Sequence, residues 1–317
     1  MSGLTLQIKA ITAEAKDILG FELVSAEGED LPVFGPGAHL ELELPNGMLR
    51  HYSISSGCWE RNRYVIAVGL SPVSRGGSKF MHGELRVGDR IRTSVPRNHF
   101  PLIENGERYD FIAGGIGITP ILAMVRWCEE VGKPWFLHYL VRNRLRTAFY
   151  EELQQFPAGR VKYHFLDEND GRHLDIESTL SAIPFDSQIY CCGPIPLMER
   201  VKAVASDRPE ANVHFEWFTA APKAETDLEE GFIVVARQSG ITVDIPPGKG
   251  ILEVLEDNGL SLPFSCREGL CSSCETRVLA GVPDHRDMVL SAEQKASNET
   301  MLICVSRSKS EVLELDV

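Results

Sequence analysis

Four of the eight cysteines in this 317-residue chain lie in its last quarter, and their spacing limits the possible folds more than any other feature. Cys266, Cys271 and Cys274 form a C-x4-C-x2-C run, and Cys304 follows further along the chain. This is the spacing of a [2Fe–2S] site, in which four thiolates surround two irons. The end of the chain is therefore predicted to fold around such a cluster.

The chemistry of a cluster also explains the residues between the cysteines. One tight loop can supply three thiolates only if its backbone folds over the sulfides, and Gly269 gives the loop that freedom. Loop N–H groups can then stabilise the negative cluster. A zinc site or a set of buried free cysteines is the alternative. Zinc sites usually combine two short cysteine or histidine elements and this chain has one, so the spacing favours the cluster.

Composition and charge exclude several classes of protein. With 43% hydrophobic and 24% charged residues the chain is in the globular range, and its net charge of −13 disfavours a nucleic-acid-binding protein. Lys9 and Glu14 interrupt the N-terminal apolar residues, so no export signal is expected. The most apolar stretch, residues 111–125, is too short and too rich in glycine to cross a bilayer. We expect no membrane association and a cytoplasmic location.

Residues 1–101 have the pattern of short strands separated by turns. Residues 39–44 alternate apolar and polar side chains with period two, as a half-buried antiparallel strand does, and the turn Pro45-Asn-Gly47 follows. Turn signals recur about every ten residues, which is typical of a small all-β barrel or sandwich. Further strands are predicted at residues 49–55, 63–68 and 89–95.

Between residues 102 and 222, strands alternate with helices. An apolar strand at residues 109–113 leads into the turn Gly114-Gly-Ile-Gly-Ile-Thr-Pro120 and then a helix. Such alternation predicts a parallel sheet of the doubly wound kind. The other predicted strands are residues 135–141, 161–166 and 188–192, and the predicted helices are residues 121–131, 147–155 and 196–205.

A polar, acidic segment without periodicity begins at Pro222 and is predicted to be a linker. Beyond it, residues 232–237 and 241–245 are two plausible paired strands, and residues 250–258 a helix. The expected division of the chain is therefore 1–101, 102–222, a linker at 223–230, and 231–317.

Two glycine-rich turns follow strands of the middle region. The first is Gly114 to Pro120 and the second is Tyr190-Cys-Cys-Gly-Pro194. Turns at the carboxyl ends of parallel strands line a ligand crevice, where a pyrophosphate can approach backbone N–H groups. The first turn does not match the Gly-x-Gly-x-x-Gly fingerprint. Cys192 has no evident histidine partner, so we expect a buried or nicotinamide-contacting cysteine and not a nucleophile.

The barrel region contains two candidate ligand-binding motifs. In Arg50-His-Tyr-Ser53, the cation and the aromatic ring share one face of a strand and could hold a flat anionic ligand, although an exposed strand face is an equally good interpretation. Arg75-Gly-Gly-Ser78 has the ingredients of a phosphate-binding nest, or of a plain surface turn. The stretch Asp284-His-Arg-Asp287 could be a partner surface or a solvated loop, and by itself it favours the loop, with His285 as a satisfied surface histidine.

Together these motifs resemble the phthalate dioxygenase reductase family, to which vanillate O-demethylase reductases also belong. The resemblance covers essentially the whole chain in the same domain order. The segments that carry it are Arg50-His-Tyr-Ser53, Arg75-Gly-Gly-Ser78, Gly114 to Pro120, Tyr190-Cys-Cys-Gly-Pro194, His214-Phe-Glu-Trp-Phe218, the four cysteines, Asp284-His-Arg-Asp-Met-Val-Leu290 and Cys304-Val-Ser-Arg307.

The resemblance implies a multidomain fold. A ferredoxin–NADP reductase-like core would consist of an antiparallel β-barrel flavin domain and an α/β parallel-sheet nucleotide domain. A plant-type ferredoxin domain of the α+β (β-grasp) class would follow at the C-terminus.

The resemblance also implies site residues. The cluster ligands would be Cys266, Cys271, Cys274 and Cys304. Flavin (FMN) would be held by Arg50, His51, Tyr52, Ser53, Val68, Gly76, Gly77, Ser78, Thr119 and Phe218, the last resembling an aromatic that covers the flavin. NADH would lie against Gly114, Gly115, Ile116, Thr119, Arg142, Cys192, Gly193 and Pro194.

The implied function is an NADH-dependent reductase component for a Rieske-type oxygenase, either a dioxygenase or an O-demethylase. NADH gives two electrons at once to FMN, and the cluster accepts one at a time, so electrons leave the flavin singly. No catalytic acid–base pair is expected. NADPH stays an alternative to NADH as the electron donor, because Arg142 and Arg144 could bind its 2′-phosphate.

Two other functions stay open at this point. One is a non-catalytic electron-relay or regulatory subunit of a dehydrogenase, which the glycine turns argue against. The other is a monooxygenase reductase that uses FAD. Residues 225–317 hold 17 acidic and 8 basic side chains, a net −9, so we expect a transient, electrostatically steered encounter with the oxygenase.

Overall fold

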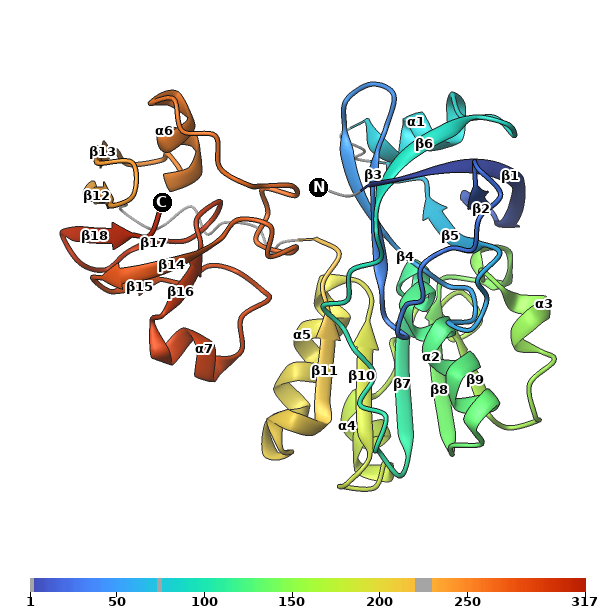
Figure 1. The fold of residues 1–317 in the computed structure, drawn as a ribbon. Coiled ribbons are helices and arrows are strands. Elements are labelled where there is room, and N and C mark those ends of the chain that lie inside the picture. The colour runs from blue at the N-terminus through green and yellow to red at the C-terminus, as the bar shows by residue number, and fades with distance from the viewer. Residues whose placement is uncertain (1–2, 73–75, 220–229) are drawn as a thin grey trace. The chain divides into compact units, whose positions relative to one another are not determined.

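The computed structural model describes residues 3–72, 76–219 and 230–317, so Arg75 and most of the predicted linker lie outside the described residues. The chain separates into two compact units, Met1–Phe218 and Thr219–Val317 (Figure 1). In the described parts of the chain, every helix is too short or too polar to cross a lipid bilayer.

The first unit begins with an antiparallel barrel. Its strands pair in the order β4-β3-β6-β1-β2-β5, and a bridge between Ile54 and Ile66 joins the two edges of the sheet. Leu6, Phe21 and Leu40 are fully buried in its core. The predicted barrel is therefore confirmed. The elements are β1 (Gly3–Ala15), β2 (Ile18–Ser25), β3 (His39–Glu43), β4 (Leu49–Ser53), β5 (Tyr64–Gly69), α1 (Gly77–Gly83) and β6 (Arg90–Ser94).

Sequence reasoning left the first two strands and α1 unassigned. Leu6 and Ile8 do alternate in β1, but the register shifts after Ile8 and again after Ala13, so the period-two signal is interrupted. The N-terminal residues, which were considered only for an export signal, form β1 and the start of β2, two adjacent strands of the barrel sheet.

The rest of the first unit is an α/β layer structure. Its strands are all parallel, in the order β11-β10-β7-β8-β9, as the alternating pattern predicts. One sheet face packs on α2, and the other packs on α4 and α5. The strands are β7 (Tyr109–Gly114), β8 (Trp135–Val141), β9 (Val161–Phe165), β10 (Gln188–Cys192) and β11 (Val213–Glu216).

Several helices of this layer differ from their predicted bounds. Helix α2 is Ile118–Val131, three residues longer than expected, because Pro120 is tolerated in a first turn whose N–H groups lack helical partners. Helix α3 is only Tyr150–Leu153, because Phe149 before it adopts a left-handed φ of 57°. Helix α4 (Ile176–Ala182) was not predicted, whereas α5 (Ile195–Val204) was. Short 3-10 turns lie at Gly115–Gly117, Arg144–Arg146, Ala205–Asp207 and Glu210–Asn212.

The second unit is a mixed sheet packed against one helix. Its strands pair in the order β13-β12-β18-β14-β16. Strands β12 and β13 pair with each other as predicted, and they are antiparallel. Helix α6 buries Ile251, Leu252 and Leu255 against the sheet. The elements are β12 (Phe232–Ala236), β13 (Ile241–Ile245), α6 (Ile251–Asp257), β14 (Glu275–Ala280), β15 (Pro283–Asp284), α7 (Ala292–Ser297), β16 (Thr300–Leu302), β17 (Arg307–Ser308) and β18 (Val312–Leu315).

Candidate functional site

The four predicted cluster cysteines lie as two pairs in the second unit. The Cys266 and Cys271 thiols share a hydrogen bond, and so do those of Cys274 and Cys304. Hydrogen bonding to Cys271, together with burial, raises the pKa of Cys266. No three metal-binding side chains of the described residues are grouped as a single-ion site. Two thiols for each of two irons are what a [2Fe–2S] cluster needs, so this donor set fits one.

The backbone of the cysteine loop turns tightly, through several residues of positive φ, and directs N–H groups towards a cysteine sulfur. Gly269 has a φ of 69°, and an added Cβ would lie 2.6 Å from Val305 Cγ2. Arg267 and Ser272 also have positive φ, which is uncommon for residues with side chains. The N–H groups of Glu268 and Leu270 point at Cys266 Sγ, at 3.3 and 3.5 Å. The loop thus directs its N–H groups towards sulfur, as predicted.

The stretch from Asp284 to Asp287 is not a solvated loop, and this interpretation is corrected. The side chain of His285 is 8% exposed and that of Asp287 is fully buried. Asp287 Oδ1 accepts hydrogen bonds from the Val289 and Leu290 N–H groups, and the N–H of Met288 donates to Gly269 O. The charged residues of this segment predicted exposure to solvent, but the segment packs against the cysteine loop and supports it.

The two barrel motifs that were predicted to bind one ligand are adjacent in the structure. The Arg50 side chain on β4 packs against Gly77, leaving no room for a Cβ there. Gly76 has a φ of 96° and lies against Met48, whose sulfur is 3.3 Å from Arg50 Nη2. Arg50 therefore lies beside the glycines of the predicted nest. Ser78, in the same turn, accepts a hydrogen bond from the Ser71 N–H.

The aromatic and polar side chains of β4 lie on two different faces of the strand. Burial raises the pKa of Tyr52 to about 12, and nearby Arg50 opposes the shift. His51 lies on the opposite strand face, with Nε2 3.5 Å from Glu41 Oε2. The alternation of β4 thus separates Arg50 and Tyr52 from His51 and Ser53.

Ser53 brings a residue to the site that sequence reasoning missed. Its hydroxyl donates to Glu216 Oε2 at 3.3 Å, linking the barrel to the last strand of the α/β sheet. Burial raises the pKa of Glu216 to about 8, against the opposing effect of Ser53. Glu216 belongs to the segment His214-Phe-Glu-Trp-Phe218. A carboxylate in this largely apolar strand is the sequence signal that could have identified it as a site residue.

The two glycine turns of the α/β layer pack directly on each other. A Cβ at Gly193 would lie 2.9 Å from Gly114 Cα, and one at Gly117 would collide with the Cys192 carbonyl. By contrast Gly115, with a φ of 54°, faces open space, and its carbonyl accepts a hydrogen bond from Tyr139 Oη at 3.1 Å. Some glycines here serve backbone packing, whereas Gly115 adjoins open space.

Other predicted residues of this region are less accessible. The Cys192 side chain is fully buried, and burial raises its pKa well above the usual value, in agreement with its not being a nucleophile. Val68 is 1% exposed in the barrel core, and its carbonyl lies 2.8 Å from His82 Nε2. Thr119 is buried and donates to Ile116 O at 3.0 Å. Pro194 is the N-cap residue of α5.

The aromatic pair at the end of the first unit divides between core and solvent. Trp217 packs against the hydrophobic cluster under α4 and α5. Phe218 is 39% exposed. Of the two rings, Phe218 is the one left available for a ligand.

The arginines after β8 already have acidic neighbours. Arg142 Nε is 3.7 Å from Asp167, and Asn143 donates to the same carboxylate at 2.8 Å. Arg144 contacts Glu168 through two nitrogens and lies over the Phe165 ring. These arginines are therefore balanced by carboxylates at the carboxyl end of β9.

Comparison with known proteins agrees with this description. Residues 234–309 match the model of the 2Fe-2S iron-sulfur cluster binding domain. The chain is 45% identical to tetrachlorobenzoquinone reductase of Sphingobium chlorophenolicum, over 100% of this chain and 99% of that protein. It is 40% identical to phthalate dioxygenase reductase of Burkholderia cepacia, over 99% and 97% of the two chains.

Solved structures give the same result. A phthalate dioxygenase reductase, described as modular for electron transfer from pyridine nucleotides to [2Fe-2S], matches with a TM-score of 0.75 and 39% identity over 100% and 98% of the chains. An intact type IV self-sufficient cytochrome P450 monooxygenase matches with a TM-score of 0.90 and 33% identity over 99% of this chain. The matched region is 41% of that longer chain.

The fold and the paired cysteines define a reductase core joined to an iron–sulfur domain. The chain belongs to the phthalate dioxygenase reductase family and is an oxidoreductase. Both the family resemblance and the fold class predicted from the sequence are thus confirmed.

Proposed function

We propose that this protein is the NADH-dependent reductase component of a Rieske-type oxygenase system, passing electrons from FMN through a [2Fe–2S] cluster to a dioxygenase or O-demethylase. One observation carries the proposal. The first unit brings together β4, the α1 turn, the two glycine turns and Glu216, and the second unit holds the paired cysteines. Relatives named as reductases of phthalate and vanillate oxygenation support it.

The flavin site would be built on the barrel. Arg50, Gly76, Gly77 and Ser78 would hold the phosphate, because the cation lies beside the glycine backbone and both favour an anion. Tyr52 and Phe218 would lie against the ring, with His51, Ser53, Val68 and Thr119 around it. When bound, the flavin takes up two electrons together and gives them up singly.

The nucleotide would enter the crevice at the carboxyl ends of the parallel strands. Gly115 and Ile116 on one turn, and Gly193 and Pro194 on the other, would line it, with Gly114, Thr119 and Cys192 behind. Arg142 would lie near the adenosine ribose. Asp167 and Glu168 already balance the arginines there, and a 2′-phosphate would meet those carboxylates, so this end of the crevice favours NADH over NADPH.

Glu216 would hold a proton beside the flavin strand. With a pKa of about 8 it is largely protonated at neutral pH, and Ser53 lies between it and β4. A carboxyl group that already holds its proton cannot accept a second one. The Ser53–Glu216 pair would therefore present a neutral, hydrogen-bonded group beside β4, and no acid–base pair is required.

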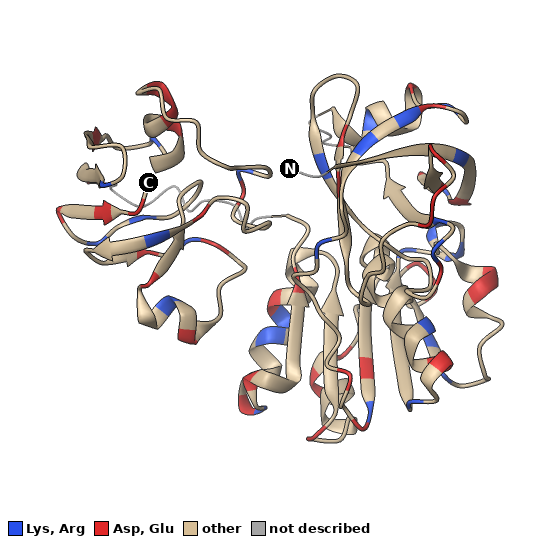
Figure 2. Cartoon of the chain, in the orientation of Figure 1, with Lys and Arg blue, Asp and Glu red and all other residues tan. Residues whose placement is uncertain are grey.

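In the second unit, Cys266, Cys271, Cys274 and Cys304 would bind the cluster. The full division of the chain would be 1–101, 102–222, 223–230 and 231–317. We place the protein in the cytoplasm, with no nucleic-acid or membrane partner. Its encounter with the oxygenase would be brief and electrostatic, since acidic residues lie on α6, α7 and β18 (Figure 2).

The purified chain provides the test. NADH should reduce an artificial acceptor without any other protein, and extraction should release FMN together with two irons and two sulfides per chain. A chain that reduces no acceptor would instead be an electron-relay subunit. Release of FAD by an active chain would identify the monooxygenase-reductase alternative.

A further inference from the structure

The segment before α7 holds a buried charge that borders the cysteine loop. The Asp287 side chain is fully buried, and a Cβ added at Gly269 would lie 3.1 Å from Asp287 Cα. The N–H of Met288 donates to Gly269 O at 3.1 Å. Because Gly269 lies between Cys266 and Cys271, Asp287 is in contact with the loop that supplies three of the predicted cluster ligands.

The surroundings of Asp287 favour its charged form. Oδ1 accepts hydrogen bonds from the N–H groups of Val289 and Leu290, at 3.0 and 2.7 Å. Lys295 on α7 places Nζ 3.7 Å from the same oxygen and donates to the main-chain O of Asp287 at 2.6 Å. N–H donors and a nearby ammonium group both stabilise a carboxylate. The cysteine loop thus has a buried negative charge beside it.

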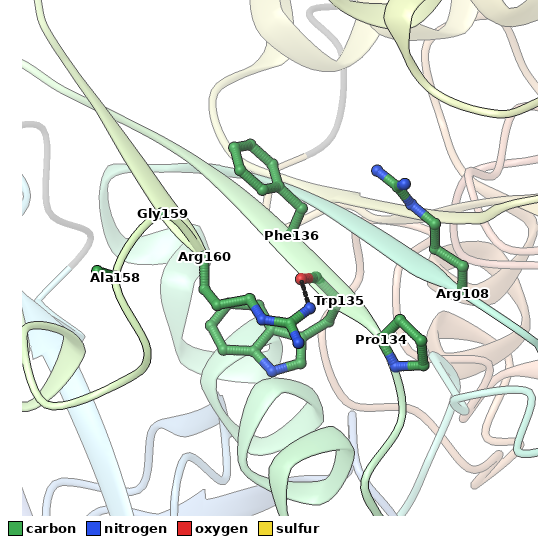
Figure 3. A pocket seen from close by; sticks show the side chains of 7 residues that line it. All are labelled: Arg108, Pro134, Trp135, Phe136, Ala158, Gly159 and Arg160. Atoms are coloured by element: carbon green, nitrogen blue, oxygen red, sulfur yellow. Dashed lines mark hydrogen bonds between the residues drawn. The ribbon is translucent and has the colours of Figure 1, made fainter.

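This charge is only partly compensated. Among the described residues, Asp287 Oδ2 has no hydrogen-bond partner, and the nearest basic group on that side, His285 Nδ1, is 3.9 Å away. Asp110, the other buried aspartate of the described chain, accepts hydrogen bonds on both oxygens, at 2.9 and 3.0 Å, from Arg108, a residue of the hollow shown in Figure 3. Asp110 is therefore neutralised locally, whereas Asp287 relies on a lysine whose side chain is 32% exposed.

We propose that Asp287 and Lys295 set the reduction potential of the [2Fe–2S] cluster through their charges. The inference rests on the cluster binding of the proposed function. Net charge near a cluster is one of the factors that fix its potential. A buried carboxylate disfavours the addition of an electron, and an ammonium group favours it, with little water to screen either. Asp287 therefore keeps the potential low, and Lys295 offsets part of this effect.

The test is a reductive titration of the full-length, cluster-loaded protein against a redox dye of known potential, followed by electron paramagnetic resonance. Asp287→Asn keeps the shape of the side chain and removes its charge. We expect the midpoint potential to rise by about 59 mV or more, a tenfold change in a one-electron equilibrium constant. Lys295→Met should lower the potential, by about threefold in the same constant, because its charge is partly screened by solvent.

The opposite signs separate an electrostatic role from a structural one. If the two residues only supported the loop, both variants would shift the potential in the same direction or leave it unchanged. Either result would overturn the inference. If Asp287→Asn protein does not fold, Lys295→Met decides alone: a lowered potential supports the inference, and an unchanged or raised one contradicts it.

Asp244→Asn is the matched control. Asp244 is exposed on β13, which is three strand spacings, or about 14 Å, from the strand β14 that follows Cys274. Its charge is screened at that distance near 0.1 M salt, so the potential should stay unchanged. Equal shifts in Asp244→Asn and Asp287→Asn would contradict the inference. Wild-type protein without a reducible cluster would contradict the proposed function as well, whereas a reducible cluster with unmoved potentials would contradict the inference alone.

Discussion

The cysteine loop and the proposed cofactor crevice of the first unit are built in different ways. Three of the four predicted cluster cysteines lie within residues 266–274, and the loop conformation is set locally by Gly269 and its neighbours. The proposed crevice would combine residues from β4, the α1 turn, the first glycine turn, β10 and β11, which are far apart in sequence. A local site can be disabled without harming the rest of the chain, whereas an assembled site depends on how whole elements pack.

The largest expected effect separates the two sites. Cys271→Ser should remove most of the cluster absorbance, because one of the four thiolates is lost, and should leave NADH-dependent reduction of a flavin-level dye intact. Visible spectra and dye assays measure both. Cys58→Ser, at a half-buried cysteine of the barrel, is the control and should change neither. Loss of dye reduction in folded Cys271→Ser protein would mean that the two sites are not independent.

Backbone packing in the crevice should be the next most sensitive feature. Gly117→Ala forces a methyl group into the Cys192 carbonyl, and we expect a loss of about 3 kcal/mol in the free energy of unfolding of the first unit. The methyl group of Gly115→Ala has open space, so only the left-handed φ is unfavourable, and we expect a loss of about 1–2 kcal/mol in the free energy of unfolding. Denaturant unfolding compares them. Equal losses would show that the close approach of the two turns does not matter.

The barrel half of the crevice can be tested through its cation. Arg50→Ala should weaken flavin binding about tenfold or more, because the phosphate loses a charge-assisted partner. Flavin fluorescence during dilution or titration measures this. Arg92→Ala removes an exposed arginine of the same barrel, paired with Glu43, and should leave flavin affinity unchanged. Unchanged flavin occupancy in the Arg50 variant would remove that residue from the site.

Glu216 should make the stability of the first unit depend on pH. Its pKa is raised from 4.5 to about 8 in the folded protein, so the folded state keeps a proton that the unfolded chain releases. This stabilisation is complete below about pH 4.5 and is lost as pH rises through 8. Glu216→Gln should therefore gain stability relative to wild type between pH 5 and 8.5, by about 4 kcal/mol or about ten degrees. A pH-independent difference would contradict the raised pKa.

The smallest expected effect concerns the partner. Exposed charges more than about 10 Å apart are screened near 0.1 M salt. Electron delivery to the oxygenase should slow several-fold from low to high ionic strength, while NADH-to-dye reduction within one chain should change little. Stopped-flow rates at matched pH compare the two. A flat profile for both would indicate that the acidic surface serves solubility, and an equal fall would indicate salt acting on nucleotide binding.

The sequence by itself determined the features that depend on local spacing. The cysteine run, the positive φ of Gly269 and the alternation of strands and helices between residues 109 and 205 follow from short-range chemistry and periodicity, and all are found in the structure. The local signal failed where a bulge interrupted it, as in β1, and where a residue took an unexpected φ, as Phe149 did before α3.

Only the tertiary structure decided which distant groups meet. Nothing in the sequence places Glu216 on Ser53, Arg50 on Gly77, or the Cys192 carbonyl against Gly117, because each contact depends on how strands pack and on the twist of whole sheets. The same holds for His285 and Asp287, whose charged neighbours suggested solvent until their packing placed them inside. Burial then sets their chemistry: a carboxyl group such as Glu216 keeps its proton near neutral pH because the surrounding protein, and not its own sequence, removes it from water.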